Sequence, residues 1–261
     1  PKPPEILVFS DLDGTLIDHD TYSYDAAKEC LAVLRRRRIP LILASSKTAA
    51  EIIPLRRELG FEGSPAICEN GAGVIEGGAG AEASDDDYRR LRRVLDRVPE
   101  GLRRRFRGFG DMTTEEVVAA TGLGREAAGR ARQRNFSEPG LWSGSEADMA
   151  RFLEYLKQEG ISATAGGRFL TLSFGATKAD RMVEILARYG GPVSIGLGDA
   201  PNDVEMINAA DNGVIDANPS HAPLPTLDGE KSGRIIRTKK PGPEGWSGAV
   251  MRILSNLGIT E

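Results

Sequence analysis

The chain carries, near its start, the stretch Ile6-Leu7-Val8-Phe9-Ser10-Asp11-Leu12-Asp13-Gly14-Thr15, in which an apolar run leads into two carboxylates. The apolar run predicts a buried strand over residues 5–10. In an extended chain residues i and i+2 face the same way, so Asp11 and Asp13 are expected to point into one site. Like charges that close repel, burial penalises each ionised form, and a bound cation relieves both costs. The alternative is a loop that begins with two ordinary solvated acids.

The composition is that of an ordinary globular protein of 261 residues, with 40% hydrophobic and 28% charged residues. The formal net charge of −4 argues against a nucleic-acid partner. No apolar run approaches the roughly 20 residues that cross a bilayer, so no membrane partner is expected. Cys30 and Cys68 are expected to be buried free thiols of a reducing compartment. Because no signal-peptide segment precedes the first strand, the cytoplasm is the expected location.

The excess of arginine over lysine fits a heat-adapted source, although genome composition produces the same bias. The oligomeric state has no signature in the sequence.

Strands and helices are expected to alternate in two blocks at the two ends of the chain. In the first block we expect strands over 5–10, 39–44, 66–68 and 73–76, and helices over 24–37 and 48–59. In the second block we expect helices over 178–188 and 202–209, and strands over 193–197, 213–216 and 234–237. This rhythm predicts right-handed crossovers, a parallel sheet and the α/β class.

Between the two blocks the sequence changes character after the glycine-rich connector at residues 77–81. Arginine-rich helices are expected over 88–98, 113–121, 125–133 and 146–159, and short strands near 104–109, 135–136, 162–165 and 169–173. Few strands with amphipathic helices on one side predict an inserted α+β lid. We therefore expect a core over residues 1–80, a lid over 81–173 and the rest of the core over 174–261. The alternative is one larger α/β domain with long loops.

Three further polar segments follow expected strands or open expected helices. Ser45-Ser46-Lys47-Thr48 offers hydroxyls and N–H groups to an anion such as phosphate, although a serine N-cap explains one hydroxyl alone. Lys178 opens a helix, where the dipole disfavours a cation, so an anionic partner is expected. Gly198-Asp199-Ala200-Pro201-Asn202-Asp203 places two acids four residues apart across a turn.

All these segments are expected to gather at the carboxyl edge of the parallel sheet, where open α/β sheets bind their ligands. Three or four carboxylates with one lysine form the ligand set of a hard cation such as Mg²⁺, which keeps waters and a substrate phosphate in its shell. A zinc site is not expected, because the chain has only two histidines and its two cysteines are isolated in sequence.

In this order the segments resemble the signature of the haloacid dehalogenase (HAD) superfamily, which reads Asp-x-Asp-x-Thr, a Ser or Thr, a Lys, and Gly-Asp-x-x-x-Asp. A lid of this size after the third strand is similar to the Cof-like subgroup. The resemblance implies a Rossmann-like parallel-sheet HAD core with an inserted α+β (C2-type) cap. It also implies a Mg²⁺-dependent phosphatase that works through an aspartyl-phosphate.

The resemblance further implies a role for each matched residue. Asp11 would be the nucleophile and Asp13 the general acid and base. Ser45 and Lys178 would bind the phosphoryl oxygens. The Mg²⁺ ligands would be the Asp11 carboxylate, the Asp13 carbonyl, Asp199, and a water held by Asp203 or Asn202.

Five segments are similar to the branch of this subgroup that acts on mannosyl-3-phosphoglycerate in mannosylglycerate (compatible-solute) synthesis: residues 8–16, 45–48, 69–72, 167–169 and 242–246. A phosphoglycerate carries a carboxylate beside its phosphate, so cations or amide donors are expected to face it. The candidate substrate-binding residues are Lys47, Glu69, Asn70, Gly71 and Arg168, with Arg132 and Arg134 as weaker ones.

Other functions remain open from the sequence. The same chemistry serves other sugar phosphates of the sucrose- or trehalose-phosphate type. A phospho-acceptor signalling module also combines strand-end acids with a hydroxyl and a lysine, but it lacks a general acid two residues after the phosphorylated aspartate. A nucleic-acid-binding lid is disfavoured by the acidic net charge.

Overall fold

The computed structural model describes residues 4–78, 80, 82–220 and 222–259. The chain divides into two compact units. The first comprises the described residues of Pro1–Ser46, Leu55–Ala81 and Thr177–Glu261, and the second comprises Lys47–Pro54 and Glu82–Ala176. Most of the second unit is thus one long segment inserted into the sequence of the first.

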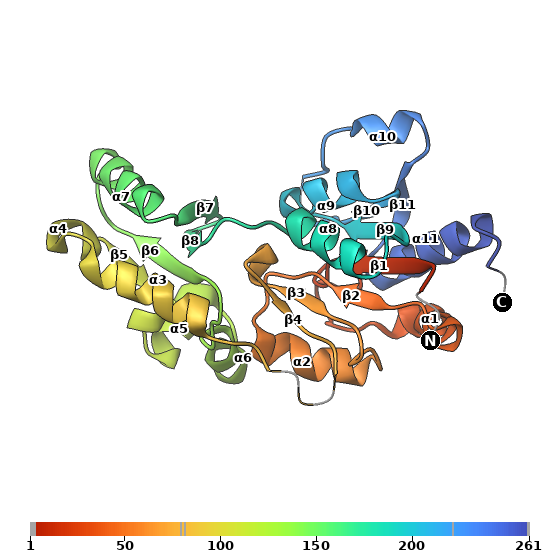
Figure 1. The fold of residues 1–261 in the computed structure, drawn as a ribbon, viewed down its shortest axis with the longest axis horizontal. Coiled ribbons are helices and arrows are strands. Elements are labelled where there is room, and N and C mark those ends of the chain that lie inside the picture. The colour runs from red at the N-terminus through yellow and green to blue at the C-terminus, as the bar shows by residue number, and fades with distance from the viewer. Residues whose placement is uncertain (1–3, 79, 81, 221, 260–261) are drawn as a thin grey trace. The chain divides into compact units, whose positions relative to one another are not determined.

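The first unit is built on a five-stranded parallel sheet in the order β11-β10-β9-β1-β2 (Figure 1). Its strands are β1 (Ile6–Ser10), β2 (Leu41–Leu43), β9 (Val193–Gly198), β10 (Asn212–Ala217) and β11 (Ile235–Pro241). β1 pairs with β2 on one side and β9 on the other, and every one of its residues is buried. A parallel strand is covered on both faces, which explains why β1 is apolar from Ile6 to Phe9. The predicted α/β class is confirmed.

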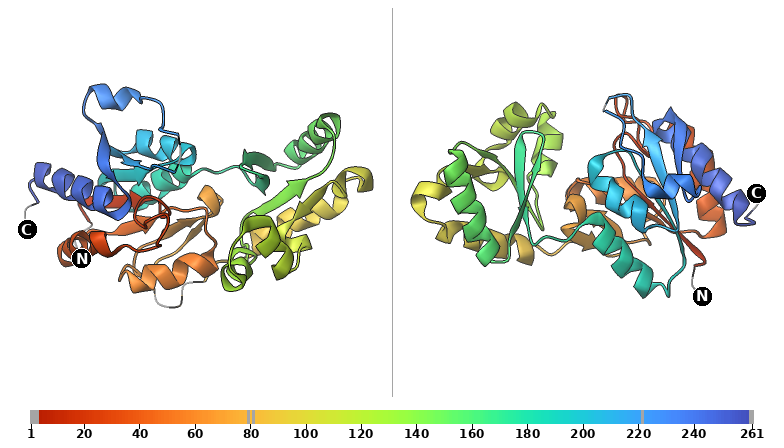
Figure 2. Two further views of the ribbon diagram at one scale, coloured as in Figure 1. Left: turned by 180° about the vertical axis from the view of Figure 1, so that it is seen from behind. Right: turned by 90° about the horizontal axis from the view of Figure 1, so that it is seen from above.

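Helices cover both faces of this sheet (Figures 1 and 2). Along β1 the side chains alternate, so Leu7 and Phe9 pack with α8 and α9, whereas Ser10 contacts α11. The helices of this unit are α1 (Lys28–Arg37), α8 (Lys178–Arg188), α9 (Val204–Ala209), the short α10 (Asp228–Lys231) and α11 (Gly242–Asn256), while α2 (Ala49–Glu58) is shared by both units. α11 is not predicted by the sequence pattern, because its first residues, Gly-Pro-Glu-Gly, are typical of a turn.

A short hairpin stands beside the parallel sheet. β3 (Ala66–Cys68) and β4 (Gly73–Ile75) pair antiparallel, and a single parallel bridge from Ala44 to Ile67 links β3 to the end of β2. The one-turn 3-10 helix η2 (Glu69–Gly71) joins them, and both Glu69 and Asn70 have positive φ, of 52° and 59°. The predicted strand near 73–76 therefore exists but lies in a hairpin.

The second unit contains a four-stranded antiparallel sheet in the order β5-β6-β8-β7. The strands are β5 (Phe106–Gly108), β6 (Glu138–Trp142), β7 (Ser162–Gly166) and β8 (Phe169–Ser173), and the helices are α3 (Asp86–Arg97), α4 (Glu100–Arg103), α5 (Thr114–Thr121), α6 (Arg125–Ala131) and α7 (Glu146–Gln158). Leu170 and Leu172 pack with α3 and α7 on one face of the sheet. Leu141 and Phe169 point to the other face and pack with α5 and α6. The prediction that the helices lie on one side is wrong for these two.

The strand predicted near 135–136 is also wrong, because β6 begins at Glu138. Its Pro139 and Gly140 have low strand propensity. Glu138 is fully buried, and its carboxylate accepts hydrogen bonds from the Tyr88 hydroxyl at 2.6 Å and the Arg92 guanidinium at 2.9 Å. Within the described ranges, no helix is long and apolar enough to span a membrane.

Gly71 is predicted to be intolerant of any side chain, because η2 lies against the start of α8. A Cβ on Gly71 would lie 2.1 Å from the carbonyl carbon of Thr177, and the residue has a φ of +95°. Gly190 has a similar φ of +82°, but a Cβ added there meets no described atom within 4 Å. In chemical denaturation, Gly190→Ala is expected to cost about 1 kcal/mol from its backbone alone, and Gly71→Ala about 1–3 kcal/mol more. Equal losses would show that η2 has room to move.

Candidate active site

A buried ion cluster lies at the carboxyl edge of the parallel sheet. The Lys178 ammonium donates to the Oδ1 atoms of Asp11 and Asp203, each at 2.7 Å. Asp11 directly follows β1, Lys178 begins α8, and Asp203 ends the 3-10 helix η4 (Pro201–Asp203) after β9. Lys178 is only 1% exposed, and a buried ammonium is tolerated only when it is paired. The anionic partner expected for Lys178 is thus the carboxylate pair itself.

The cluster shifts the titration of its members in opposite directions. Burial raises the pKa of Asp11 to about 7; Lys178 opposes this rise, while the nearby Asp203 and Asp199 add to it. Burial by itself would lower the pKa of Lys178, but the carboxylates of Asp11 and Asp203 outweigh it, and the pKa is raised above its ordinary value. Lys178 therefore stays cationic, while Asp11 lacks sufficient positive charge around it.

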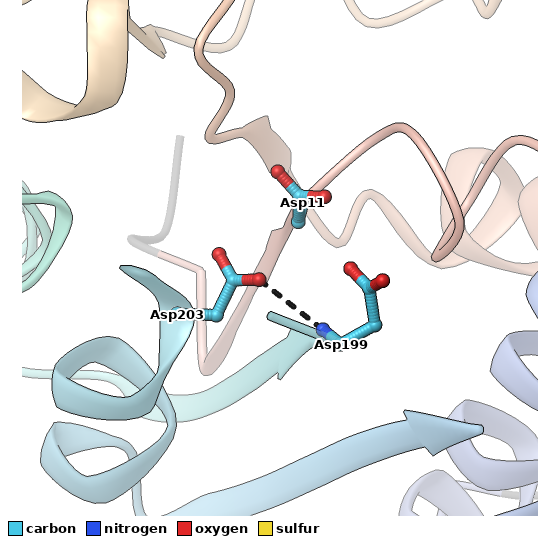
Figure 3. Close-up of side chains that lie close together, drawn as sticks. All are labelled: Asp11, Asp199 and Asp203. Carbon is cyan, nitrogen blue, oxygen red and sulfur yellow. Dashed lines mark hydrogen bonds between the residues drawn. The ribbon is translucent and has the colours of Figure 1, made fainter. Parts of the chain in front are cut away.

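Asp203 also orients the loop that carries Asp199. Its Oδ2 accepts a hydrogen bond from the backbone N–H of Asp199 at 3.2 Å (Figure 3). It also accepts one from the backbone N–H of Ala200 at 3.1 Å. The Asp199 carboxylate in turn accepts a bond from the Thr15 hydroxyl at 3.1 Å and one from the Asn218 amide at 2.5 Å. The two acids of the Gly-Asp-x-x-x-Asp segment thus have different roles, because Asp203 holds the backbone of the loop from which the Asp199 side chain projects.

The three aspartates form a buried group that can bind a metal ion. Carboxylate oxygens of Asp11, Asp199 and Asp203 lie within 4.8 Å of one another, and Figure 3 shows the three side chains grouped at the strand ends. Three carboxylates against the one ammonium of Lys178 leave two negative charges uncompensated when all are ionised. An oxygen-rich site with this excess charge fits a hard divalent cation.

Two further predicted residues lie on the loop after β2 and on η2. Ser45 is buried, its N–H donates to the Ile67 carbonyl at 3.0 Å, and its carbonyl accepts from the Asn70 N–H at 2.9 Å. The Asn70 side chain accepts a hydrogen bond from the Asn202 amide at 3.0 Å. The fold thus joins Asn70 and Asn202, which are 132 residues apart in sequence.

The remaining predicted residues of the first unit lie around these elements. Asp13, two residues after Asp11, is partly buried and forms an isolated parallel β-bridge with Ile17. Glu69 is buried in η2. Gly71 is held by Arg181 of α8, which donates to the Gly71 carbonyl at 3.1 Å.

The candidate cations Lys47, Arg132, Arg134 and Arg168 belong to the second unit. Arg132 donates to the Thr114 hydroxyl at 3.1 Å, and Arg134 donates to the Ser137 hydroxyl at 2.7 Å. Arg168 is exposed in the turn between β7 and β8, with its guanidinium 6.0 Å from the centre of the Phe169 ring. Lys47 immediately precedes Thr48 and α2.

Sequence reasoning missed three residues that support the site, namely Thr15, Asn218 and Arg181. Thr15 belongs to the quoted stretch, but its contact with Asp199 spans 184 residues and has no local signal. Asn218 directly follows β10, so the same rule that selected polar residues at strand ends would have found it. Arg181 also donates to the Ala72 carbonyl at 3.3 Å, and nothing in the sequence distinguishes it from a surface arginine.

Comparison with known proteins agrees with this geometry. The family model of haloacid dehalogenase-like hydrolases matches residues 8–94. A glucosyl-3-phosphoglycerate/mannosyl-3-phosphoglycerate phosphatase of Persephonella marina is 33% identical, and the match covers 97% of this chain and 98% of the relative.

Two solved structures share the fold. A phosphatase of the HAD superfamily from Bacteroides thetaiotaomicron superposes with a TM-score of 0.63 at 17% identity, covering 98% of this chain and 96% of the other. The sucrose-phosphatase of Synechocystis, solved with sucrose and phosphate, gives a TM-score of 0.60 at 15% identity, covering 98% of each chain. The chain belongs to the haloacid dehalogenase-like hydrolases and is a phosphatase of that family, as its ordered motifs predict.

Removing the Lys178 ammonium is expected to destabilise the fold strongly. In Lys178→Met, Asp11 and Asp203 stay buried without a cation, at a cost of about 3–5 kcal/mol near neutral pH. Lys28→Met is the matched control, because it breaks the exposed pair with Asp25 and a contact of the ammonium with the Tyr24 ring at 5.8 Å, and it should cost about 0–1 kcal/mol. Chemical denaturation with a chelator present measures both losses.

The loss in Lys178→Met should also shrink as the pH falls. Lys178 lowers the pKa of Asp11, so in Lys178→Met this pKa lies above the wild-type value of about 7. A buried carboxyl whose folded pKa lies above its unfolded value is stabilised by protonation, so the penalty in the variant is relieved as the pH falls toward about 7. A loss no larger than that of Lys28→Met, or one unchanged between about pH 8 and about pH 5, would contradict the cluster's role.

Proposed function

We propose that this phosphatase hydrolyses mannosyl-3-phosphoglycerate to mannosylglycerate and phosphate, with Mg²⁺, through an aspartyl-phosphate on Asp11. The observation that carries this proposal is the buried Asp11–Lys178–Asp203 cluster beside Asp199. It combines a carboxylate nucleophile, a fixed cation and an acidic site for a metal at one edge of the sheet. A carboxylate is an established covalent nucleophile in phosphoryl transfer.

In the first step, the Asp11 carboxylate attacks phosphorus, and the bond between phosphorus and the ester oxygen breaks. Asp13 gives its proton to the leaving alkoxide. In the second step, the Asp13 carboxylate takes a proton from a water that attacks the phosphorus of the aspartyl-phosphate. Phosphate leaves, and Asp11 and protonated Asp13 are regenerated.

The cationic and hydroxyl groups hold the phosphoryl group in place during both steps. The Lys178 ammonium is fixed 2.7 Å from Asp11 and remains charged, so it meets the phosphoryl oxygens beside the nucleophile. Ser45, on the loop after the neighbouring strand β2, supplies a hydroxyl. Positioning and charge stabilisation are the main sources of catalysis in phosphoryl transfer.

Mg²⁺ would be held by the Asp11 carboxylate, the Asp13 carbonyl and Asp199, with Asp203 or Asn202 holding a water in its shell. When bound, the ion would neutralise charge on the phosphoryl oxygens. Both oxygens of Asp203 already accept hydrogen bonds, from Lys178 and from two backbone N–H groups, which supports an outer position for this residue.

The substrate assignment rests on the relative from Persephonella marina, whose name covers both glucosyl- and mannosyl-3-phosphoglycerate. Its identity extends over nearly the full length of both chains, which supports the same class of ester for this protein. We place the reaction in the cytoplasm, where the buried thiols of Cys30 and Cys68, which are not joined in a disulfide, would stay reduced.

The direct test is phosphate release from a panel of esters, with Mg²⁺ and with a chelator. Mannosyl-3-phosphoglycerate and glucosyl-3-phosphoglycerate are expected to be hydrolysed faster than sucrose phosphate or trehalose phosphate, and the chelator should abolish turnover. Asp11→Asn should abolish phosphate release, because an amide is not a nucleophile here. Asp228→Asn, at an exposed aspartate of α10, should keep wild-type activity. Wild-type release by Asp11→Asn would refute the mechanism, and a preference for sucrose phosphate would refute the substrate.

Arg168 is expected to bind the glycerate carboxylate, because Arg132 and Arg134 already donate hydrogen bonds to hydroxyls of their own unit. Arg168→Ala should raise KM for mannosyl-3-phosphoglycerate about tenfold or more and leave KM for a small aryl phosphate within about twofold. Arg104→Ala is the control, because Arg104 is another exposed arginine of the second unit, whose guanidinium lies 3.7 Å from the Glu100 carboxylate. Equal effects of Arg168→Ala on both substrates would remove Arg168 from the binding site.

A further inference from the structure

The segment Gly242-Pro243-Glu244-Gly245-Trp246, which opens α11, has no part in the chemistry above. Its Trp246 is nonetheless fully buried, and the indole N–H donates to the Ser10 hydroxyl at 2.9 Å. The Ser10 hydroxyl donates to the backbone carbonyl of Asp11 at 2.7 Å. A chain of two hydrogen bonds therefore runs from α11 to the main chain of the nucleophile.

We propose that Trp246 and Ser10 are positioning residues, which fix the main chain of Asp11 for attack on phosphorus. The inference rests on the proposed role of Asp11. Asp11 lies just past the end of β1, where the sheet no longer fixes both of its peptide groups. Its N–H still donates to the Leu197 carbonyl of β9 at 2.9 Å, while its carbonyl is held by Ser10. Because the N–H and the carbonyl of Asp11 are both held, the direction of its Cα–Cβ bond is fixed.

Donor and acceptor are unambiguous in both hydrogen bonds, from Trp246 to Ser10 and from Ser10 to Asp11. An indole N–H can only donate, and a carbonyl oxygen can only accept. Ser10 has one hydroxyl proton, and it is given to Asp11, so its oxygen is left to accept the proton of Trp246. Consecutive bonds of this kind polarise one another in a buried setting, so the loss of the first weakens the second.

The opening of α11 is shaped to bring Trp246 to this position. A Cβ on Gly245 would lie 2.0 Å from the Lys240 carbonyl oxygen and 2.5 Å from Asp216 Oδ1. The first turn of the helix therefore lies directly against the ends of β10 and β11. Alternation along β1 turns Ser10 toward α11, because Phe9 packs on the opposite face with α8 and α9.

Trp142 gives a matched comparison within the same chain. It is the other of the two tryptophans in the chain, and its Nε1 is buried with no hydrogen-bond partner among the described residues. Its ring stacks on Phe152 at 5.0 Å between ring centres. Replacing either tryptophan with Phe removes an indole, but only at Trp246 does this remove a hydrogen bond to Ser10.

The test measures kcat, KM and folding for Ser10→Ala, Ser10→Thr, Trp246→Phe, the double variant Ser10→Ala/Trp246→Phe, and Trp142→Phe. We expect kcat to fall about tenfold in Ser10→Ala and about threefold or more in Trp246→Phe, with KM within about twofold. The double variant should match Ser10→Ala, since Trp246 acts through Ser10. Ser10→Thr, which keeps the hydroxyl, should restore activity, and Trp142→Phe should leave kcat unchanged.

A second measurement does not depend on turnover. In the ¹⁵N spectrum, the indole N–H resonance of Trp246, identified by its retention in Trp142→Phe, should shift in Ser10→Ala. The inference is overturned if folded Ser10→Ala keeps wild-type kcat, if the two single effects simply add, or if that resonance does not move. Where Ser10→Ala does not fold, Trp246→Phe decides by the same kcat criterion. A wild type that hydrolyses no ester would instead refute the proposed function.

Discussion

The Lys178 ammonium, held between the carboxylates of Asp11 and Asp203, is the interaction on which the rest of the first unit depends. It joins the end of β1, the start of α8 and the turn after β9, and Lys178 and Asp11 are 167 residues apart in sequence. A charge this deeply buried is stable only while both partners stay in place. The parallel sheet supplies that condition, because it aligns the carboxyl ends of β1 and β9 as direct neighbours.

Asp11, Asp199 and Asp203 carry the same carboxylate group but differ in their contacts. Asp11 shares Lys178 with Asp203, and burial raises its pKa to about 7. A further positive charge nearby would therefore stabilise its ionised form. Asp203 is fully committed to Lys178 and to two backbone N–H groups. Asp199 is oriented by Thr15 and Asn218. Such a site is suited to a divalent cation and a phosphate, which bring opposite charges that balance each other.

Most of the sheet, and the grouping of Asp11, Lys178, Asp199 and Asp203 at its carboxyl edge, could be predicted from the sequence, because both follow local rules. An apolar run followed by polar residues marks the end of a buried strand, and this rule located Asp11, Ser45 and Asp199. What could not be predicted depends on distant contacts. β6 contains Pro139 and Gly140 and is stabilised by the buried carboxylate of Glu138, whose partners are on α3. α11 opens like a turn, and its Trp246 is explained only by Ser10, 236 residues away.

The proposed mechanism requires that Asp11 becomes covalently phosphorylated during turnover. The most direct measurement is to mix the enzyme with mannosyl-3-phosphoglycerate and Mg²⁺, quench in acid within the first turnover, and treat with borohydride, which reduces an acyl phosphate to an alcohol. Peptide mass spectrometry should then find homoserine in place of Asp11, and only when substrate is present. Rapid phosphate release with Asp11 unmodified at every quench time, or homoserine at another aspartate, would contradict the claim.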